Sequence, residues 1–168
     1  SLLDWWNFMF NKSFFIIGYS GVGKTTVAKI MVDYLSSNGY KTLLFDGNKM
    51  SEYSILDKYN GYDICSRLKR AKQLTNIVNW VNNQNVIPIV AVIGQPKEAR
   101  SYWRKNVDEY CEIYLKAPIE TCIKRDNKAI YKNKSENIVG VDIQFDEPTC
   151  SDIILDAKNK TPDELLRD

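Results

Sequence analysis

The stretch that decides the fold is Phe14-Phe15-Ile16-Ile17-Gly18-Tyr19-Ser20-Gly21-Val22-Gly23-Lys24-Thr25. Its first four residues form an apolar run typical of a buried strand, and residues 27–35 carry apolar side chains at helical spacing. Residues 18–25 match the pattern G-x-x-x-x-G-K-[ST] in every fixed position. The order of strand, glycine-rich loop and helix therefore predicts a phosphate-binding loop (P-loop).

The residue types of this loop predict its ligands. Glycines let successive backbone N–H groups turn toward phosphate oxygens, and the N-terminus of the following helix adds partial positive charge. We expect Lys24 to reach the β- and γ-phosphates and Thr25 to bind Mg²⁺. The predicted cofactors are therefore ATP and Mg²⁺, and the residues expected to hold them are Gly21, Val22, Gly23, Lys24, Thr25 and Thr26.

Strand and helix signals alternate along the rest of the chain. Apolar runs predict four more strands, at residues 42–45, 86–93, 111–115 and 153–155. Helical periodicity predicts a helix at residues 67–80. A further helix is expected at about residues 118–125, because Pro118 suits the first helical position. Such alternation is typical of an α/β fold with a mostly parallel sheet, helices on both faces and ligands at the carboxyl ends of the strands.

The length of 168 residues, of which 44% are hydrophobic, predicts one domain with a sizeable core. We divide the chain into an N-terminal apolar extension, residues 1–13, and a P-loop domain, residues 14–168. Residues 126–144 are rich in Lys and Asn and show little periodicity, which predicts a mobile lid over the site. The extension is expected to pack against the domain or a partner subunit.

Composition excludes several classes of function. The formal charge of +2 gives no strongly basic face, so we predict no nucleic-acid partner. The apolar residues 2–10 are too few for a membrane span and include Asp4, so we predict no membrane partner. The absence of histidine removes Ser–His and Cys–His catalysis and His metal ligands. The chemistry must rely on Lys, Arg, carboxylates, hydroxyls and bound metal.

The cysteines suggest a reducing compartment. Cys65, Cys111, Cys122 and Cys150 are 46, 11 and 28 residues apart, a spacing that suits neither a zinc site nor a disulfide framework. We expect four buried, reduced thiols and a cytoplasmic location.

A P-loop alone does not separate kinases from GTPases or motor ATPases. The base-reading motif N/T-K-x-D of GTPases is missing, because an apolar pair follows Asn127-Lys128. The strand at residues 86–93 ends in Gly94-Gln95 rather than in the acidic residue expected of motor ATPases. The small size and the position of Asp46 at a strand end favour a small-molecule kinase.

Several stretches make residues 14–156 resemble the adenylylsulfate (APS) kinases. The most specific is Ala117-Pro118-Ile119-Glu120-Thr121-Cys122-Ile123-Lys124-Arg125-Asp126-Asn127-Lys128-Ala129-Ile130-Tyr131-Lys132, which resembles the family's P-L-x-x-C-x-x-R-D-x-K-G-L-Y-K. Phe45-Asp46-Gly47 resembles L-D-G, and Ala91-Val92-Ile93, with Arg100 downstream, resembles the A-F-I-S-P strand end and the arginine after it. Val139-Gly140-Val141-Asp142 and Phe145-Asp146-Glu147-Pro148 resemble T-G-I-D and Y-E-x-P at the same spacing.

The resemblance implies roles for residues on the ATP side. Arg125, Lys128 and Tyr131 would belong to the lid and the ATP pocket, and Lys132 would lie near the phosphates. Asp46 would lie close to Mg²⁺ and the acceptor hydroxyl, so Lys24 and Asp46 are the expected catalytic residues. The family resemblance also suggests a homodimer.

On the acceptor side, the resemblance assigns substrate contacts to Tyr62, Arg67, Arg70, Val92, Ile93 and Gly94. The residue types agree, because Tyr62 can stack on a base and the planar fork of Arg67 suits phosphate or sulfate oxygens. Arg70 lies three positions after Arg67, on the same face of the predicted helix.

The same side also departs from the family. Ser66 and Arg70 stand where the family has Asp and Asn, Asn48 and Ser51 replace an acid and an arginine, and Gly94-Gln95-Pro96 replaces S-P-Y. We expect a kinase that transfers the γ-phosphoryl group of ATP to the 3′-hydroxyl of APS, giving PAPS. Two alternatives stay open: a related kinase of capsule-type gene sets that phosphorylates a cytidine diphosphate derivative, and a nucleotide-binding regulatory module with little or no turnover.

Overall fold

The computed structural model describes residues 11–53, 55–56, 61, 63–126, 129–133 and 136–166. Within them, five parallel strands form one sheet in the order β2-β3-β1-β4-β5. The strands are β1 (Ser13–Ile17), β2 (Thr42–Asp46), β3 (Ile87–Ala91), β4 (Tyr110–Lys116) and β5 (Ile153–Asp156). The predicted α/β fold with a parallel sheet is confirmed.

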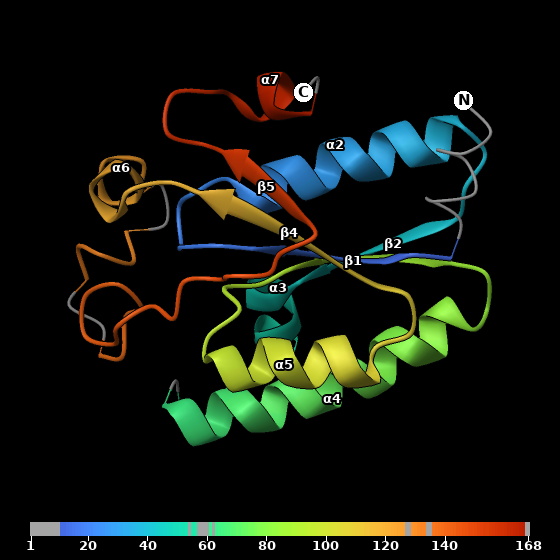
Figure 1. Cartoon of the computed structure of the whole chain (residues 1–168), viewed down its shortest axis with the longest axis horizontal. Helices are drawn as coiled ribbons and strands as arrows, with labels where there is room; N and C mark the ends of the chain where they lie inside the picture. Colours follow the sequence, from blue (N-terminus) through green and yellow to red (C-terminus); the bar gives the residue numbers. More distant parts are fainter. Residues whose placement is uncertain are drawn as a thin grey trace.

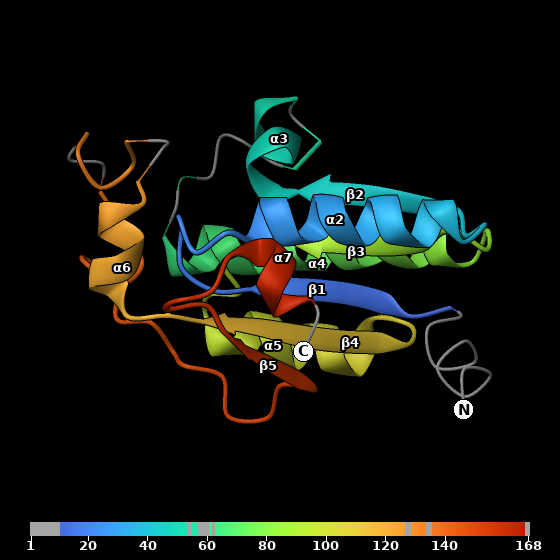
Figure 2. The same ribbon diagram turned by 90° about the horizontal axis from the view of Figure 1, so that it is seen from above.

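Helices cover both faces of the sheet (Figure 1). On one face lie α2 (Lys24–Ser37) and α7 (Pro162–Leu165), and on the other lie α4 (Ile64–Asn82) and α5 (Lys97–Asn106). The short helix α3 (Gly47–Glu52) follows β2 directly, and α6 (Ile119–Lys124) lies beyond the end of β4. Figure 2 shows α3 at the β2 edge of the sheet and α6 at the ends of the strands.

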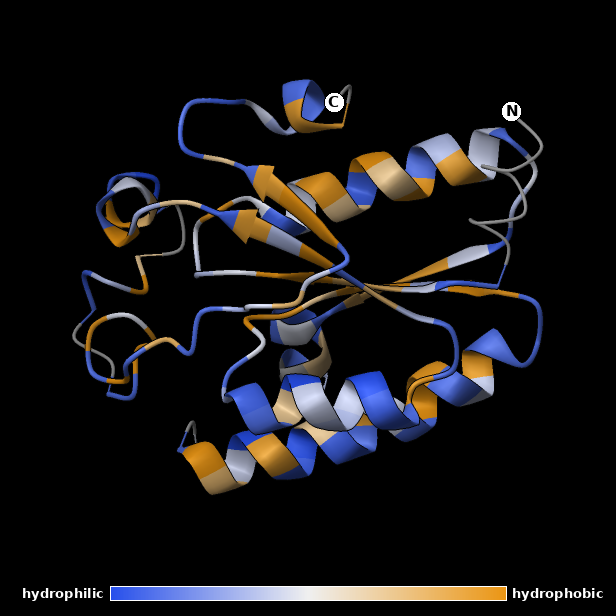
Figure 3. Cartoon of the chain, viewed as in Figure 1, coloured by the Kyte–Doolittle hydropathy of each residue, from blue (hydrophilic) through white to orange (hydrophobic). Residues whose placement is uncertain are grey.

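Strand β1 is the centre of the core. All five of its residues are buried, and their side chains alternate between the two faces of the sheet. Phe14 and Ile16 pack in the cluster beneath α2, whereas Phe15 and Ile17 pack in the cluster beneath α4 and α5. Figure 3 shows apolar strands between helices whose outer surfaces are polar. The P-loop therefore leaves the sheet from its central strand, which is fully buried.

Some elements differ in length from the sequence prediction. Helix α4 begins three residues early, at Ile64, because the Asp63 carboxylate caps it by accepting from Ser66 N at 3.0 Å. The third strand ends at Ala91 rather than at residue 93. Pro118 is the N-cap residue of α6 and not its first helical residue, because its ψ of 145° is extended.

Three helices, α3, α5 and α7, follow no prediction from the sequence. Two of them had a local signal. Ala99 and Trp103 are both buried and lie four positions apart on α5. In α7, Thr161 and Glu164 form a capping box around Pro162.

All four cysteines are free. Cys111 and Cys122 are buried as expected, but Cys65 and Cys150 are exposed, so the expectation of four buried thiols is wrong for two of them. Cys65 lies in the first turn of α4 and Cys150 in the segment that leads to β5. Among the residues that the structure describes, no helix is long and apolar enough to cross a membrane.

Candidate active site

The P-loop connects β1 to α2 through a backbone that only glycine suits. Gly18, Gly21 and Gly23 all have positive φ, and a Cβ on Gly21 would lie 2.9 Å from the backbone oxygen of Cys122. Gly23 is the N-cap residue of α2 and no side chain caps this end of the helix. Val22 is buried and fixes the loop to the core. The loop therefore presents backbone groups and the positive end of a helix, the arrangement that binds phosphate.

The predicted catalytic residues lie together at this loop. Lys24 Nζ donates to the backbone oxygens of Gly18 and Tyr19 at 2.9 and 2.6 Å, so the ammonium group lies within the curve of the loop. Thr25 Oγ1 donates to Asp46 Oδ2 at 2.7 Å. The other carboxylate oxygen accepts from Asn48 N at 2.9 Å, in the first turn of α3. Lys24 and Thr25, at the start of α2, thus lie at the loop, and Thr25 contacts Asp46 at the end of β2.

The donor set bears on the metal expected here. The described residues contain no group of three or more His, Cys, Asp or Glu side chains that could hold a metal ion. Thr25 and Asp46 instead offer one hydroxyl and one carboxylate. Hard oxygen ligands in small number fit Mg²⁺, which keeps several waters and binds mainly through substrate phosphates.

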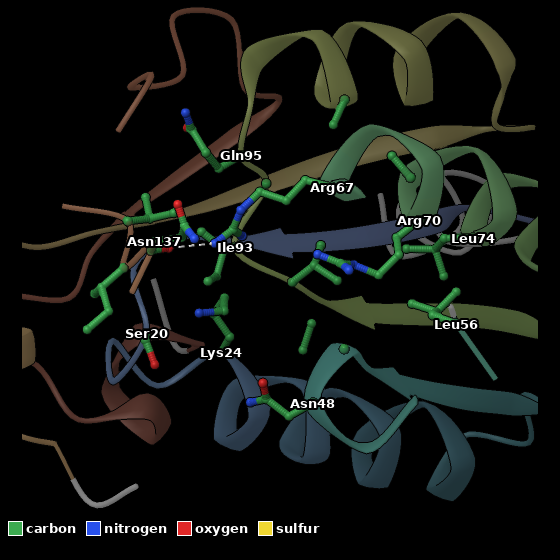
Figure 4. Close-up of a pocket in the computed structure, with 18 of the residues that line it drawn as sticks. Ser20, Lys24, Asn48, Leu56, Arg67, Arg70, Leu74, Ile93, Gln95 and Asn137 are labelled. Atoms are coloured by element: carbon green, nitrogen blue, oxygen red, sulfur yellow. Dashed lines mark hydrogen bonds between the residues drawn. The ribbon is translucent and has the colours of Figure 1, made fainter. Parts of the chain in front are cut away.

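A cavity of about 280 Å³ opens beside Lys24, at the carboxyl ends of β2 and β3. Five of the predicted substrate residues line it: Arg67, Arg70, Val92, Ile93 and Gly94. In Figure 4 the side chains of Arg67 and Arg70, from α4, reach into the same space as Lys24. Leu56, Leu74 and Trp103 line its apolar part. The cavity therefore combines cationic groups with an apolar wall.

Residues 136–139, the lid wall, form one side of this cavity. Arg67 donates to the backbone oxygen of Asn137 at 3.0 Å, a contact between residues 70 positions apart (Figure 4). Val139 is buried and forms a β-bridge with Ile143. A segment predicted from its polar composition to be a lid thus also contributes apolar residues to the core.

The residues assigned to the ATP side lie in two places. Tyr131 lies against the P-loop, where its hydroxyl donates to the backbone oxygen of Ser20 at 2.8 Å. Burial raises the pKa of Tyr131, so the phenol stays protonated and remains a donor. Arg125 instead donates to the backbone oxygens of Ala157 and Lys158, at 3.0 and 3.1 Å, and joins α6 to the segment after β5.

Other predicted residues lie at the surface or outside the described residues. The side chains of Thr26 and Lys132 are exposed. Tyr62 and Lys128 lie outside the described residues. Arg70 donates to the backbone oxygen of Gly61, which fixes the guanidinium at the edge of the cavity.

The sequence did not single out several residues that line the cavity. Ser20 and Trp103 were given no role; Asn48 and Gln95 were noted only as departures from the family pattern, and Glu136 and Asn137 only as part of the predicted lid. Ser20 occupies a variable position of the P-loop pattern. Trp103 belongs to α5, whose buried residues Ala99 and Trp103 show helical spacing in the sequence. Glu136 and Asn137 fall within the predicted lid, residues 126–144, but nothing in the sequence indicated that Asn137 would contact Arg67 of α4.

Comparison with known proteins gives the following relatives. The profile of a family described as adenylylsulphate kinase matches residues 11–156. Cytidine diphosphoramidate kinase of Campylobacter jejuni is 35% identical over 144 residues, which cover 83% of this chain and 82% of that protein. A probable adenylyl-sulfate kinase of Pyrococcus abyssi is 31% identical over 153 residues, which cover 89% and 87%.

The fold has a close counterpart among solved structures. The structure of the APS kinase of Mycobacterium tuberculosis in complex with AMPPNP and APS matches this chain with a TM-score of 0.85. The match covers 93% of each chain at 22% sequence identity. The whole described domain, from β1 to β5, therefore has the architecture of that structure.

Proposed function

The chain belongs to the adenylylsulphate kinase family, and from that premise we propose that it transfers the γ-phosphoryl group of ATP to the 3′-hydroxyl of APS, giving PAPS. Its membership makes it a P-loop kinase. One observation carries the proposal: Lys24 of the P-loop and the arginines of α4 line a single cavity. The loop that would bind the phosphates of the donor thus faces the same space as the arginines that would bind an anionic acceptor.

The donor side supports phosphoryl transfer without histidine. In this reaction, positioning and electrostatic stabilisation of the transferring group supply most of the catalysis. Lys24 would exchange the oxygens of Gly18 and Tyr19 for phosphate oxygens, next to the loop amides. Thr25 and Asp46 would hold Mg²⁺, which when bound neutralises charge on the β- and γ-phosphates. Asp46, at the end of β2, would also orient the acceptor hydroxyl.

The acceptor side supports a small nucleotide. The guanidinium groups of Arg67 and Arg70 suit an anionic bridge such as phosphosulfate. The apolar wall with Trp103 suits a base, because bases are planar and weakly hydrated on their faces. The size of the cavity, about 280 Å³, suits part of a nucleotide while the rest stays near the mouth.

A cytidine diphosphate derivative is the second candidate acceptor. Two observations favour it. One relative with 35% identity is named as a kinase of such a compound. Positions at which this chain departs from the APS kinase pattern, Asn48, Arg70 and Gln95, all line the cavity. A diphosphate would then take the place of the phosphosulfate beside the two arginines.

An ADP-release assay with a panel of acceptors tests the proposal. Purified protein with ATP and Mg²⁺ is given APS, cytidine diphosphate derivatives and free nucleotides in turn. We expect turnover on APS. Turnover on a cytidine compound with none on APS assigns the function to the second candidate. Silence across the panel, with ATP still bound, would favour the regulatory module.

We further propose that the chain forms a homodimer and acts in the cytoplasm. The four free cysteines support a reducing compartment, because two of them are exposed and would be open to oxidation elsewhere. Light scattering of the purified chain measures the oligomeric state directly. A monomer at all concentrations contradicts the dimer.

A further inference from the structure

A cluster of polar side chains, two of them buried, lies at the wall of the acceptor cavity. It consists of Gln95, after β3, Arg100, on α5, and Asp146, in the segment that follows the lid. Gln95 is 5% exposed and Arg100 is 8% exposed. Burial of a guanidinium and a carboxamide carries a large desolvation cost unless each polar group is matched.

Gln95 and Asp146 bond reciprocally, because the side-chain amide of Gln95 both donates to and accepts from Asp146. Gln95 Nε2 donates to Asp146 Oδ2 at 2.9 Å and to the backbone oxygen of Gln144 at 3.1 Å. In return, Asp146 N donates to Gln95 Oε1 at 3.0 Å. Asp146 Oδ2 also accepts from Lys97 N at 3.1 Å, at the start of α5. One carboxylate thus holds both the end of the β3 loop and the first turn of α5.

Arg100 also links the segment after β3 to the segment that contains Asp146. It donates to the backbone oxygens of Gly94 and Asp146, the latter at 2.6 Å. Among the described residues it forms no ion pair, so its hydrogen-bond partners are neutral carbonyls. Gly94 lies at the cavity and has a positive φ. A Cβ on Gly94 would lie 3.0 Å from the Ile17 side chain of β1, so the turn packs closely against that strand. Arg100 therefore fixes the carbonyl of a cavity residue.

Phe145 extends the cluster to the donor side. Its ring centroid lies 4.8 Å from that of Tyr19, in the P-loop, and 5.9 Å from the guanidinium carbon of Arg100. Figure 4 shows Gln95 beside Ile93, at the cavity end away from Leu56. The cluster thus joins three parts of the site: the end of β3, the segment after the lid wall, and the P-loop.

We propose that Gln95, Arg100 and Asp146 form a positioning unit that sets the acceptor strand end, residues 92–94, at the distance from the P-loop that phosphoryl transfer requires. This inference rests on the proposed function, because it takes residues 92–94 as an acceptor contact. None of the three side chains is assigned a chemical step. Their effect is on geometry, and a displacement of about 1 Å at a reacting centre is enough to cost about 100-fold in rate.

Asp146→Ala and Asp146→Asn are the informative pair of variants. The alanine variant loses both acceptor bonds of the carboxylate, whereas asparagine keeps an oxygen that can accept from Gln95 and Lys97 N. We expect kcat/KM for the acceptor nucleotide to fall about 10- to 100-fold in the alanine variant, with recovery to within about threefold in the asparagine variant. The Kd of AMPPNP, measured by calorimetry, should stay within about threefold in both. Asp33→Ala, an exposed site on α2, is the matched control.

The outcomes separate positioning from a merely structural role. Equal loss of AMPPNP and acceptor affinity, together with a lower melting temperature, overturns the proposal. Unchanged acceptor kinetics in Asp146→Ala overturns it as well. If Asp146→Ala does not fold, Arg100→Lys takes its place, because lysine keeps the charge but loses the planar fork that spans the two carbonyls.

Failure of the proposed function has a different signature. A wild-type chain that turns over no nucleotide contradicts the proposed function alone. Calorimetric binding of APS and of cytidine diphosphate to wild type and Asp146→Ala then decides the positioning role. Weaker binding in the variant supports it, and equal affinities overturn it.

Discussion

The donor and acceptor sides of this site are built in different ways. On the donor side, one continuous loop supplies backbone amides, and Lys24, Thr25 and Asp46 complete it within a few ångströms. On the acceptor side, side chains come from α3, α4, α5, the end of β3 and the lid wall. Backbone donors are the same whatever the side chains, whereas each acceptor contact depends on one side chain. Phosphate binding by the loop amides therefore tolerates changes at the variable loop positions, although the chemistry still depends on Lys24, Thr25 and Asp46. On the acceptor side, single replacements can change which acceptor is bound.

Removal of the Lys24 ammonium should have the largest effect. Lys24→Ala removes a charge aimed at the transferring phosphoryl group, and groups of this kind are worth about 2.7–4 kcal/mol. We expect kcat to fall by about 10²–10³-fold. The melting temperature should stay close to that of wild type, because the part-buried ammonium donates to loop carbonyls and is not part of the apolar core. Lys29→Ala, on the exposed face of α2, is the control. Activity within about threefold of wild type would remove the P-loop from the mechanism.

Asp46→Asn should have the next largest effect, and it tests whether Asp46 acts in the transfer step or only in nucleotide binding. The amide keeps the shape of the strand end but loses the negative charge beside Thr25. We expect kcat to fall by about 100-fold with little change in AMPPNP affinity. Steady-state kinetics and calorimetry measure the two quantities. If AMPPNP affinity collapses while turnover per bound ATP is normal, Asp46 is a nucleotide-binding residue only.

Arg67→Ala should act on the acceptor and leave ATP binding alone. The guanidinium faces the cavity and also holds Asn137 of the lid wall, so its loss weakens both contacts. We expect a loss of about 2 kcal/mol in kcat/KM for the acceptor, or about 30-fold. Arg67→Lys should recover little, because an ammonium group cannot form the same fork. A matching loss of AMPPNP affinity would contradict the separation of the two sides.

The donor side was largely predictable from the sequence for a physical reason. Its residues are close along the chain, and the spacing of Gly18, Gly23 and Lys24 is dictated by the path of the backbone around phosphate. Asp46 followed from its place at a strand end, since parallel strands bring their carboxyl ends to one edge. The strands followed from apolar runs, helices α2 and α4 from apolar periodicity, and α6 from the position of Pro118.

The acceptor side was predictable only in part. Arg67, Arg70 and residues 92–94 were identified and do line the cavity. Glu136 and Asn137 were predicted only as part of a lid, and the contact of Asn137 with Arg67 was not, because a contact between residues 70 positions apart leaves no local pattern. Arg125 shows the opposite case: a clear motif places it next to the lid, but its guanidinium is held by the carbonyls of Ala157 and Lys158. A motif specifies residue types, whereas the packing of distant segments decides which groups each guanidinium contacts.

A substitution in the lid should have the smallest effect. The lid contacts both the donor side and the acceptor side of the site. Tyr131 bonds to Ser20 of the P-loop and Arg67 bonds to Asn137, so one segment touches both donor and acceptor residues. Tyr131→Phe removes one hydrogen bond, worth about 1 kcal/mol, and should lower hydrogen-exchange protection of residues 129–133 by about fivefold in the absence of nucleotide. We expect AMPPNP to increase protection of these residues in wild type, because cationic lid residues such as Lys132 can then close on phosphate. The rise should be smaller in the variant. Equal protection with and without AMPPNP would make the segment a static wall of the site, and the donor and acceptor sides would then be coupled through the buried Phe145 contact rather than through lid closure.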